Sequence, residues 1–542
     1  MNGSARRSGY LIVPCLAAGL LAAPLVGHGL PDFESHLGEE YQPLKALKFF
    51  HSRGQEFHKW GPADNFLYAP GYALSLLYWK HQGTFGPASK SFPYGFHRPL
   101  QQLTALILQS RILLVCFVLL SLALLGANLV AAGFSRLATF FALFLCAASN
   151  PVLVWQAVIL KGDGPMIAFS SLALGTYVVI VRRGITIVRA LWLATFIAWA
   201  VTSKELAVSL FALPCLGLAF EGFRRSHSPE LRSRIRRAVV VGLVTLVGWY
   251  ALLNVIYAPS TWLRRMHYLT VGNDLAIWGA PNRSASDYAR EIIQALTNNL
   301  GPGGMLAAAA SIALLLALRP RGSWSLALPF ASFVLLGLLP AGYVPDRFAL
   351  PAALGLVSLV ACAVDALRQR IPSWSRRSSI ALVVLTAVNL LYANIAWLAL
   401  RSRPEDLIEA YVQANLPTDE LFSIFSFWPR IPGKSRLEIL GYRLDPRPIA
   451  EVVGKANDLP KTVLIDNDLQ RWIEDFTRRP QRAAMVAEET GFRAADWESF
   501  KALGYRLTDR LSSRLPGWYP FVWIPLAAES NARTVLVYRR LE

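Results

Sequence analysis

Residues 223–257 read FRRSHSPELRSRIRRAVVVGLVTLVGWYALLNVIY, so that six arginines stand directly before an apolar run. The run, residues 238–257, has about the 20 residues that a helix needs to cross the hydrocarbon core of a bilayer. Short loops rich in arginine and lysine stay on the cytoplasmic side of a membrane. The stretch therefore predicts a membrane-spanning helix whose arginine-bearing end faces the cytoplasm.

Ten more segments of the chain are apolar over a similar length, although several are short. Together with the first they predict a polytopic α-helical membrane protein with about eleven transmembrane helices. The ten are approximately residues 10–27, 108–132, 137–152, 165–181, 187–203, 205–221, 302–318, 324–340, 348–367 and 379–400.

Arginines gather in the connections at one face of this predicted bundle, and only Glu221, Glu230 and Asp365 oppose them there. We therefore expect that face and the N-terminus to be cytoplasmic. An odd number of spans then places the C-terminal part in the periplasm or outside the cell, for a protein of a bacterial-type inner membrane. Besides the six quoted above, the arginines are Arg6, Arg7, Arg136, Arg182, Arg183, Arg189, Arg319, Arg321, Arg368, Arg370, Arg376 and Arg377.

The composition agrees with a membrane protein, since 54% of the residues are hydrophobic and 16% are charged. The formal net charge of +19 lies almost wholly in residues 1–400, because residues 401–542 hold 21 basic and 20 acidic side chains. A basic excess interleaved with apolar runs is typical of orientation in a bilayer, so nucleic acid is not an expected partner. All five cysteines lie in apolar runs, which excludes a disulfide framework or a CxxC metal site.

Two domains are predicted. Residues 1–400 form the membrane domain, in which residues 28–103 make a first outer loop, and Phe66 to Tyr78 form an amphipathic helix along the outer membrane surface. The first span is expected to stay as an anchor, although Arg6 and Arg7 before small apolar residues also fit a cleaved signal peptide.

Residues 401–542 mix short strand-like runs with helical stretches and predict a small soluble α/β domain. The strand-like runs are Thr462 to Ile465 and Thr534 to Tyr538, and the helical stretches are Glu405 to Asn415 and Ala494 to Leu503.

Polar residues concentrate in two outer-face regions. One is the first loop, with its acids and six of the eight histidines, and the other is the short turn Lys161-Gly162-Asp163-Gly164. Ionisable residues at membrane depth are costly and tend to mark function, whereas residues of a long loop are ordinarily solvated. Asp163 is therefore a stronger single candidate than any one acid of the first loop.

Several motifs in the same order resemble one known family. They are Glu39-Glu40-Tyr41-Gln42-Pro43-Leu44-Lys45-Ala46-Leu47-Lys48-Phe49-Phe50-His51-Ser52-Arg53-Gly54, Tyr68-Ala69-Pro70-Gly71-Tyr72, Arg111, Lys161-Gly162-Asp163-Gly164-Pro165, Ser203-Lys204-Glu205 and Pro345-Asp346-Arg347-Phe348-Ala349-Leu350-Pro351. Over roughly residues 10 to 400 they are similar to the lipid A aminoarabinose transferase and the protein mannosyltransferases. Those enzymes are GT-C glycosyltransferases that use polyprenyl-phosphate sugars.

The resemblance implies an inverting transfer of a sugar from a polyprenyl-phosphate donor to a glycan, lipid or protein acceptor. One carboxylate within hydrogen-bond reach then takes the proton of the acceptor hydroxyl. Glu39 of the Glu39-Glu40 pair is the first candidate. The family usually has Asp-Glu at this pair, so Asp32 and Glu34 stay as alternates.

Cations at the same face would stabilise the phosphate of the leaving lipid, and Arg347, Lys204 and Lys161 are the candidates. Arginine can bind phosphate oxygens as a bidentate fork, which favours Arg347. An interfacial side chain reaching for water is the alternative reading of Arg347. Asp163 is a candidate to orient the sugar, hold a lysine or help to bind a metal, and it also fits the cap of a helix that begins at Pro165, two roles that are compatible.

The histidines of the first loop form no strong metal-ligand pattern: His36 lies close to Glu39, and His51 precedes His58 by seven residues. A divalent metal cofactor is therefore left open. Two other functions are alternatives for such a membrane protein. A transporter or flippase of lipid-linked saccharides would show paired half-molecules with broken helices, which this sequence does not. The other is a non-catalytic membrane assembly protein that works through its C-terminal domain.

Overall fold

The structure is a computed structural model. It describes residues 5–27, 30, 43–54, 61–89, 93–225, 228–270, 284–318, 323–341, 344–371, 376–401, 404–425, 437, 441–445, 459–466, 499–500, 502–512 and 534–540.

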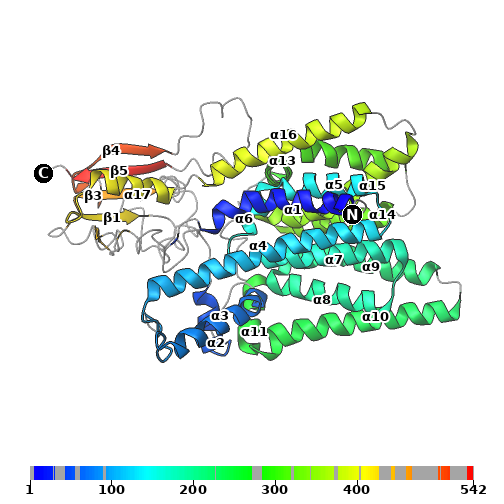
Figure 1. The fold of residues 1–542 in the computed structure, drawn as a ribbon, viewed down its shortest axis with the longest axis horizontal. Helices are drawn as coiled ribbons and strands as arrows, with labels where there is room; N and C mark the ends of the chain where they lie inside the picture. The colour runs from blue at the N-terminus through cyan, green and yellow to red at the C-terminus, as the bar shows by residue number, and fades with distance from the viewer. Residues whose placement is uncertain are drawn as a thin grey trace.

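Each of the eleven predicted segments falls on a helix, and these helices form one bundle (Figure 1). Six helical stretches are long and apolar enough to cross a membrane, and five shorter apolar helices accompany them in the described chain. The number of spans stays a prediction. The helices are α1 (Ala5–Val26), α4 (Pro99–Ala131), α5 (Arg136–Leu143) with the π-helical turn η1 (Phe144–Ala148), α7 (Asp163–Arg183), α8 (Ile187–Ser203), α9 (Val208–Arg225), α10 (Pro229–Tyr250) with η3 (Ala251–Ile256), α13 (Ala285–Leu318), α14 (Ser323–Phe333) with η4 (Val334–Leu338) and η5 (Leu339–Ala341), α15 (Leu350–Arg370) and α16 (Arg376–Arg401).

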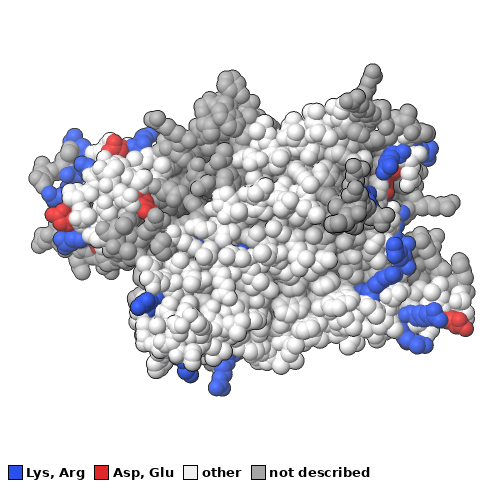
Figure 2. All heavy atoms as spheres, in the orientation of Figure 1, with Lys and Arg blue, Asp and Glu red and all other residues white. Residues whose placement is uncertain are grey.

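Helices α7 and α15 are buried along most of their length and form the centre of the bundle, whereas α10 lies at its edge. The exposed side chains of α10 include Val240, Leu243, Val244 and Val247, which are of the kind that contacts lipid. Figure 2 shows a broad surface without charges between two ends that carry them. This is the distribution that a bilayer around the bundle requires.

Shorter helices lie near the ends of the long ones. They are α2 (Leu44–His51), α3 (Ala63–His81), α6 (Pro151–Gln156), η2 (Glu205–Ala207), α11 (Pro259–Thr270) and η6 (Asp346–Ala349). Figure 1 shows α2, α3 and α11 gathered at the end of the bundle that faces the C-terminal sheet. The stretch Phe66 to Tyr78 is helical within α3, as predicted, with Leu74, Leu77 and Tyr78 exposed.

The C-terminal part holds a five-stranded sheet in the order β2-β1-β3-β5-β4. Strand β1 pairs in parallel with β2 and β3, and β5 pairs antiparallel with β3 and β4. Helix α17 packs its Ile408 and Val412 against buried strand residues such as Val537. The elements are α17 (Pro404–Asn415), β1 (Leu421–Phe425), β2 (Arg443–Leu444), β3 (Thr462–Asp466), β4 (Tyr505–Ser512) and β5 (Thr534–Arg540).

Both predicted strands of this part are confirmed as β3 and β5, and the first predicted helix as α17. The second predicted helix, Ala494 to Leu503, lies mostly outside the described residues. One sheet thus combines parallel and antiparallel pairing beside a helix, while the α/β class of the whole C-terminal domain stays a prediction. The boundary between residues 400 and 401 stays a prediction.

Candidate functional site

Three of the predicted site residues meet in a buried cluster at one end of the bundle. Asp163 is only 1% exposed, and Lys204 and Lys161 are 4% and 5% exposed. The Lys204 ammonium donates a hydrogen bond to Asp163 Oδ1, and Lys161 Nζ lies 4.0 Å from Asp163 Oδ2. One carboxylate thus holds two lysines that come from different turns of the chain.

The capping alternative for Asp163 is wrong, because α7 begins at Asp163 itself and not at Pro165. Gly162 occupies the N-cap position, and no side chain caps the helix there. The carboxylate is therefore used for the lysine pairing and does not satisfy backbone N–H groups of its own helix.

Glycine at position 162 is what lets the Asp163 turn approach the Lys204 turn. A Cβ atom on Gly162 would lie 2.4 Å from the carbonyl oxygen of Ser203, which is far inside van der Waals contact. The backbones of the two turns are therefore in direct contact. This contact brings the side chains of Asp163 and Lys204, 41 residues apart, within hydrogen-bond reach.

Arg347 joins the cluster through η6. It is close enough to interact electrostatically with Lys161, Asp163 and Lys204. Two of the cations lie over the ring of Phe348, with Lys204 Nζ 4.7 Å and Arg347 Cζ 5.9 Å from its centroid. A cation over an aromatic face is attracted by the ring quadrupole, so Phe348 helps to hold both cations in place.

The turn that carries Arg347 is fastened to α13. Asn298 Nδ2 donates to Asp346 Oδ1 at 2.9 Å, and Asn299 Nδ2 donates to the Asp346 carbonyl oxygen at 2.7 Å. Two residues further on, Gly301 has φ 68° and joins the two helical halves of α13 at a kink. The kink therefore decides where the two asparagines, and through them Arg347, are held.

Asn389 of α16 fixes this kink. Its Oδ1 accepts hydrogen bonds from the backbone N–H groups of Gly303 and Gly304, at 3.1 and 3.2 Å. Its Nδ2 donates to Ser149 Oγ at 2.6 Å. One buried amide thus satisfies the backbone donors that the kink leaves free and ties α13 to α16 and to the end of η1.

The cluster is rich in positive charge. Lys161, Lys204 and Arg347 all lie close enough to Asp163 to act on its carboxylate. Burial lowers the pKa of Lys161, which lies in the turn between helices, and the charge of Arg347 lowers it further. Repulsion of this kind is relieved when an anion enters. The arrangement is therefore suited to a phosphate group.

A second polar network beside the cluster was not predicted. Glu205 follows Lys204 directly, and its Oε1 lies 3.0 Å from Arg265 Nε of α11. Arg265 also donates to Asn254, whose Nδ2 donates to Thr202 Oγ1 at 3.0 Å. The only signal in the sequence was the position of Glu205 after Lys204, because Arg265 stands about 60 residues later in the chain.

Described parts of the first loop pack against the same turn. A Cβ atom on Gly61 would lie 1.7 Å from the carbonyl oxygen of Thr202, so the two backbones touch. Lys45 Nζ is paired with the buried Asp64 at 2.9 Å. The first loop is also joined to the chain before α11, where Tyr257 contacts an aromatic group made of Phe49, Phe50 and Phe66.

Glu39, Glu40, Asp32 and Glu34, the predicted base and its alternates, lie outside the described residues. His36 and His58 also lie outside the described residues. Over the part of the chain that the structure describes, no group of three or more His, Cys, Asp or Glu side chains could hold a metal ion. The base and the metal therefore stay as predictions.

Arg111, which the sequence motifs singled out, is fully buried within α4. Its Nη1 donates to the carbonyl oxygen of Val26 at 2.9 Å. Carbonyl groups at the end of a helix lack partners within that helix. Arg111 therefore ties the end of α1 to α4.

No protein-family model and no curated protein matches this chain. Among solved structures it is similar to ArnT from Cupriavidus metallidurans bound to undecaprenyl phosphate, at 12% identity over 98% of each chain with a TM-score of 0.46. It is also similar to the oligosaccharyltransferase AglB from Archaeoglobus fulgidus, in complex with an inhibitory peptide and a dolichol-phosphate. That match has 15% identity, covers 95% of this chain and 74% of that chain, and has a TM-score of 0.46.

A third similar structure is the protein O-mannosyltransferase Pmt1-Pmt2 complex of S. cerevisiae bound to the sugar donor. It matches at 17% identity over 49% of this chain and 35% of that chain, with a TM-score of 0.30.

Proposed function

We propose that this chain is an inverting GT-C-type glycosyltransferase that moves a sugar from a polyprenyl-phosphate donor to a glycan, lipid or protein acceptor at the outer face of the inner membrane. The observation that carries the proposal is the cluster of the buried Lys161 and Lys204 and the half-buried Arg347 around Asp163. Cations gathered at helix ends are suited to a phosphate in a region of low dielectric.

In this reaction the acceptor hydroxyl oxygen attacks the anomeric carbon of the donor sugar. The bond from that carbon to the phosphate oxygen breaks, and the phosphate keeps the electron pair. The acceptor proton passes to a carboxylate, for which Glu39 is the first candidate and Glu40, Asp32 and Glu34 are the alternates. Arg347 and Lys204 stabilise the negative charge that develops on the lipid phosphate.

Asp163 has a different role from the base. Its carboxylate is already paired with Lys204 and lies near Lys161, so it orients the two ammonium groups toward the donor. A metal-dependent variant of the reaction would need ligands from the acids and histidines of the first loop.

The cluster also bears on the alternative functions. Its residues lie in turns and at helix ends, and not in broken helices at the middle of the bundle. A transporter site is expected near the bilayer midplane between repeated halves. The arrangement supports chemistry at one face of the membrane more than passage across it.

The test is transfer of radiolabelled sugar from a panel of polyprenyl-phosphate donors, in membranes that hold equal amounts of wild-type or variant protein. Loss of a charge-stabilising group typically costs about 10²- to 10³-fold in rate, so Lys204→Met and Arg347→Met are expected to fall by that order. Glu39→Gln is expected to abolish transfer. Lys80→Ala is the control, because Lys80 is an exposed lysine at the same end of the bundle.

Wild-type transfer that survives in both Lys204→Met and Arg347→Met would overturn the proposal. The proposal would also be overturned if the wild-type protein bound none of the polyprenyl-phosphate donors of the panel, as measured by native mass spectrometry.

A further inference from the structure

A polar cavity lies at the arginine-rich end of the bundle, between the ends of α4, α7, α13 and α15. Its volume is about 540 Å³, within the range of roughly 300–1,000 Å³ that small-molecule sites occupy. Arg182, Arg370, Asp365, Gln369 and Leu318 are among the residues that line it. It lies at the opposite ends of α7 and α15 from the Asp163 cluster, so it is a separate site.

Two of the charged groups in this cavity are held in place by neighbours. Arg182 Cζ lies 4.8 Å from the centroid of the Phe134 ring, and its Nη2 lies 4.0 Å from Cys362 Sγ. Asp365 Oδ2 accepts a hydrogen bond from the backbone N–H of Ser135 at 3.1 Å. Their positions are therefore set by the protein before any ligand enters.

The charges of the cavity do not neutralise one another. Across the described residues, Arg182, Arg370 and Asp365 form no ion pair, although all three line the same space. Two cations and one carboxylate that stay apart are complementary to a ligand with a negative and a positive centre. A phosphate with an attached ammonium has this character.

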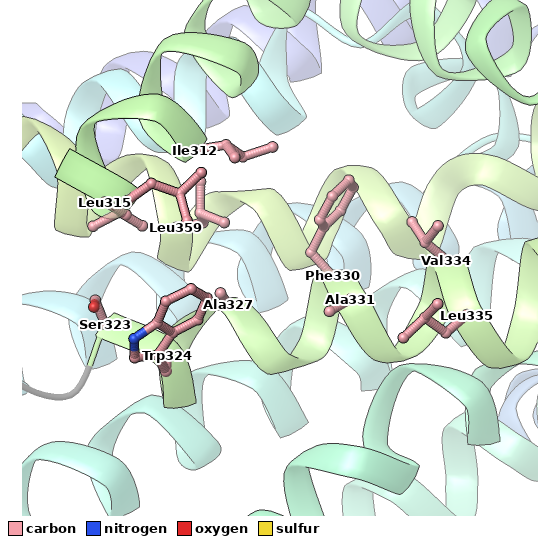
Figure 3. A pocket seen from close by; sticks show the side chains of 11 residues that line it. Ile312, Leu315, Ser323, Trp324, Ala327, Phe330, Ala331, Val334, Leu335 and Leu359 are labelled. Carbon is pink, nitrogen blue, oxygen red and sulfur yellow. The ribbon is translucent and has the colours of Figure 1, made fainter. Parts of the chain in front are cut away.

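An apolar groove of about 330 Å³ is lined in part by the same two helices, α13 and α15, and otherwise by α14 with η4. Leu315 of α13 lies three residues before Leu318, and Leu359 of α15 lies three residues before Cys362, so groove and cavity share one face of each helix. Figure 3 shows Ile312 and Leu315 across the groove from Trp324. A polar cavity and an apolar groove on the same faces of two helices match a headgroup and an acyl chain.

We propose that the cavity and the groove together bind one ethanolamine phospholipid of the leaflet at the arginine-rich end. Arg182 and Arg370 bind the phosphodiester, since guanidinium groups match phosphate oxygens. Asp365 binds the ammonium, and the groove takes an acyl chain. A choline headgroup has no N–H to donate and a glycerol headgroup has no cation, so Asp365 selects against both.

The experiment is native mass spectrometry of the full-length protein in detergent, titrated with ethanolamine, choline and glycerol phospholipids of identical acyl chains. The ethanolamine lipid is expected to bind most tightly. Arg182→Gln and Arg370→Gln are each expected to weaken it about tenfold, as loss of a charged hydrogen bond does. Arg183→Gln is the matched control, because Arg183 is exposed and does not line the cavity.

Asp365→Asn tests selectivity without disturbing the fold, because the amide oxygen still accepts the Ser135 hydrogen bond. It is expected to bind ethanolamine and glycerol lipids equally. Ala327→Trp fills the groove and is expected to reduce lipid binding while water-soluble glycerophosphoethanolamine still binds. Melting temperatures measured without lipid confirm that each variant is folded.

Equal affinity of the wild type for the three lipids would overturn the proposal. So would binding of inorganic phosphate as tight as that of the lipid, since the site would then be one for a free anion. The proposal would also be overturned if folded Arg182→Gln and Arg370→Gln bound the ethanolamine lipid as tightly as the wild type does.

Discussion

At the scale of single residues, the site depends on one carboxylate placed among cations. Asp163 is held to Lys204 by a hydrogen bond and lies 4.0 Å from Lys161. An isolated buried charge is costly, and pairing is what makes it tolerable. Here Lys161, Lys204 and Arg347 gather around the Asp163 carboxylate. Gathered cations are suited to a phosphate, and Lys161 is the residue whose protonation depends most on whether one is bound.

The lowered pKa of Lys161 predicts a pH dependence of donor binding. A bound phosphodiester raises that pKa again, so binding takes up a proton. Affinity is then highest below the pKa in the free protein and falls as the pH rises toward the pKa in the complex, by up to about tenfold per pH unit. Calorimetric titration with a polyprenyl-phosphate sugar at a series of pH values below the ordinary lysine pKa measures this.

Lys161→Arg supplies the control, since a guanidinium keeps its charge over this range. Its affinity is expected to stay level with pH. If the variant shows the same slope as the wild type, Lys161 is not the group that titrates. The phosphodiester itself carries a constant charge in this range and adds no slope.

At the scale of the elements, the position of Arg347 follows from the kink in α13. Asn298 and Asn299 stand just before the kink and hold the η6 turn, while Asn389 of α16 binds the backbone just after it. Gly301 has φ 68°, a conformation that costs other residues free energy. The geometry of a candidate phosphate ligand thus depends on a glycine and an asparagine that touch no substrate.

Gly301→Ala is expected to destabilise the protein by about 1–3 kcal/mol, because the residue is held at positive φ. Its Cβ would also lie 2.4 Å from Asn389 Oδ1. Thermal unfolding in detergent measures the effect, and sugar transfer is expected to fall with it because the η6 turn shifts.

Gly248→Ala is the matched control within α10. A Cβ there meets nothing within 4 Å, and alanine stabilises a helix relative to glycine by about 0.4–1 kcal/mol where it fits. Equal melting temperatures of the two variants would contradict the role given to the kink.

At the scale of the whole molecule, the face drawn in Figure 2 carries charges toward its two ends and a broad uncharged surface between them. The arginine-rich connections lie at one end, and the Asp163 cluster and the C-terminal sheet lie toward the other (Figure 1). Arginine-rich loops remain in the cytoplasm. The whole arrangement therefore predicts that the cluster works at the outer face and the proposed phospholipid binds in the inner leaflet.

Cysteine labelling of spheroplasts, which have lost the outer membrane but keep the inner membrane intact, tests this orientation. A membrane-impermeant maleimide is expected to label Ala410→Cys, an exposed position of α17, and to label Arg234→Cys only after the membrane is made permeable. The protein without added cysteines gives the background of its five native thiols. The opposite pattern of labelling would invert the topology and remove the outer-face assignment.

The sequence by itself determined that the protein is a helical membrane protein and where its apolar helices lie, because apolar length and arginine bias act locally along the chain. It also singled out Lys161, Asp163, Lys204 and Arg347 through their motifs. It could not show that these four meet, and it missed Glu205 with Arg265. Those contacts join turns far apart in the chain, and they depend on glycines that let backbones touch and on the α13 kink. Only the tertiary structure decides such long-range packing, because no local pattern of residues encodes it.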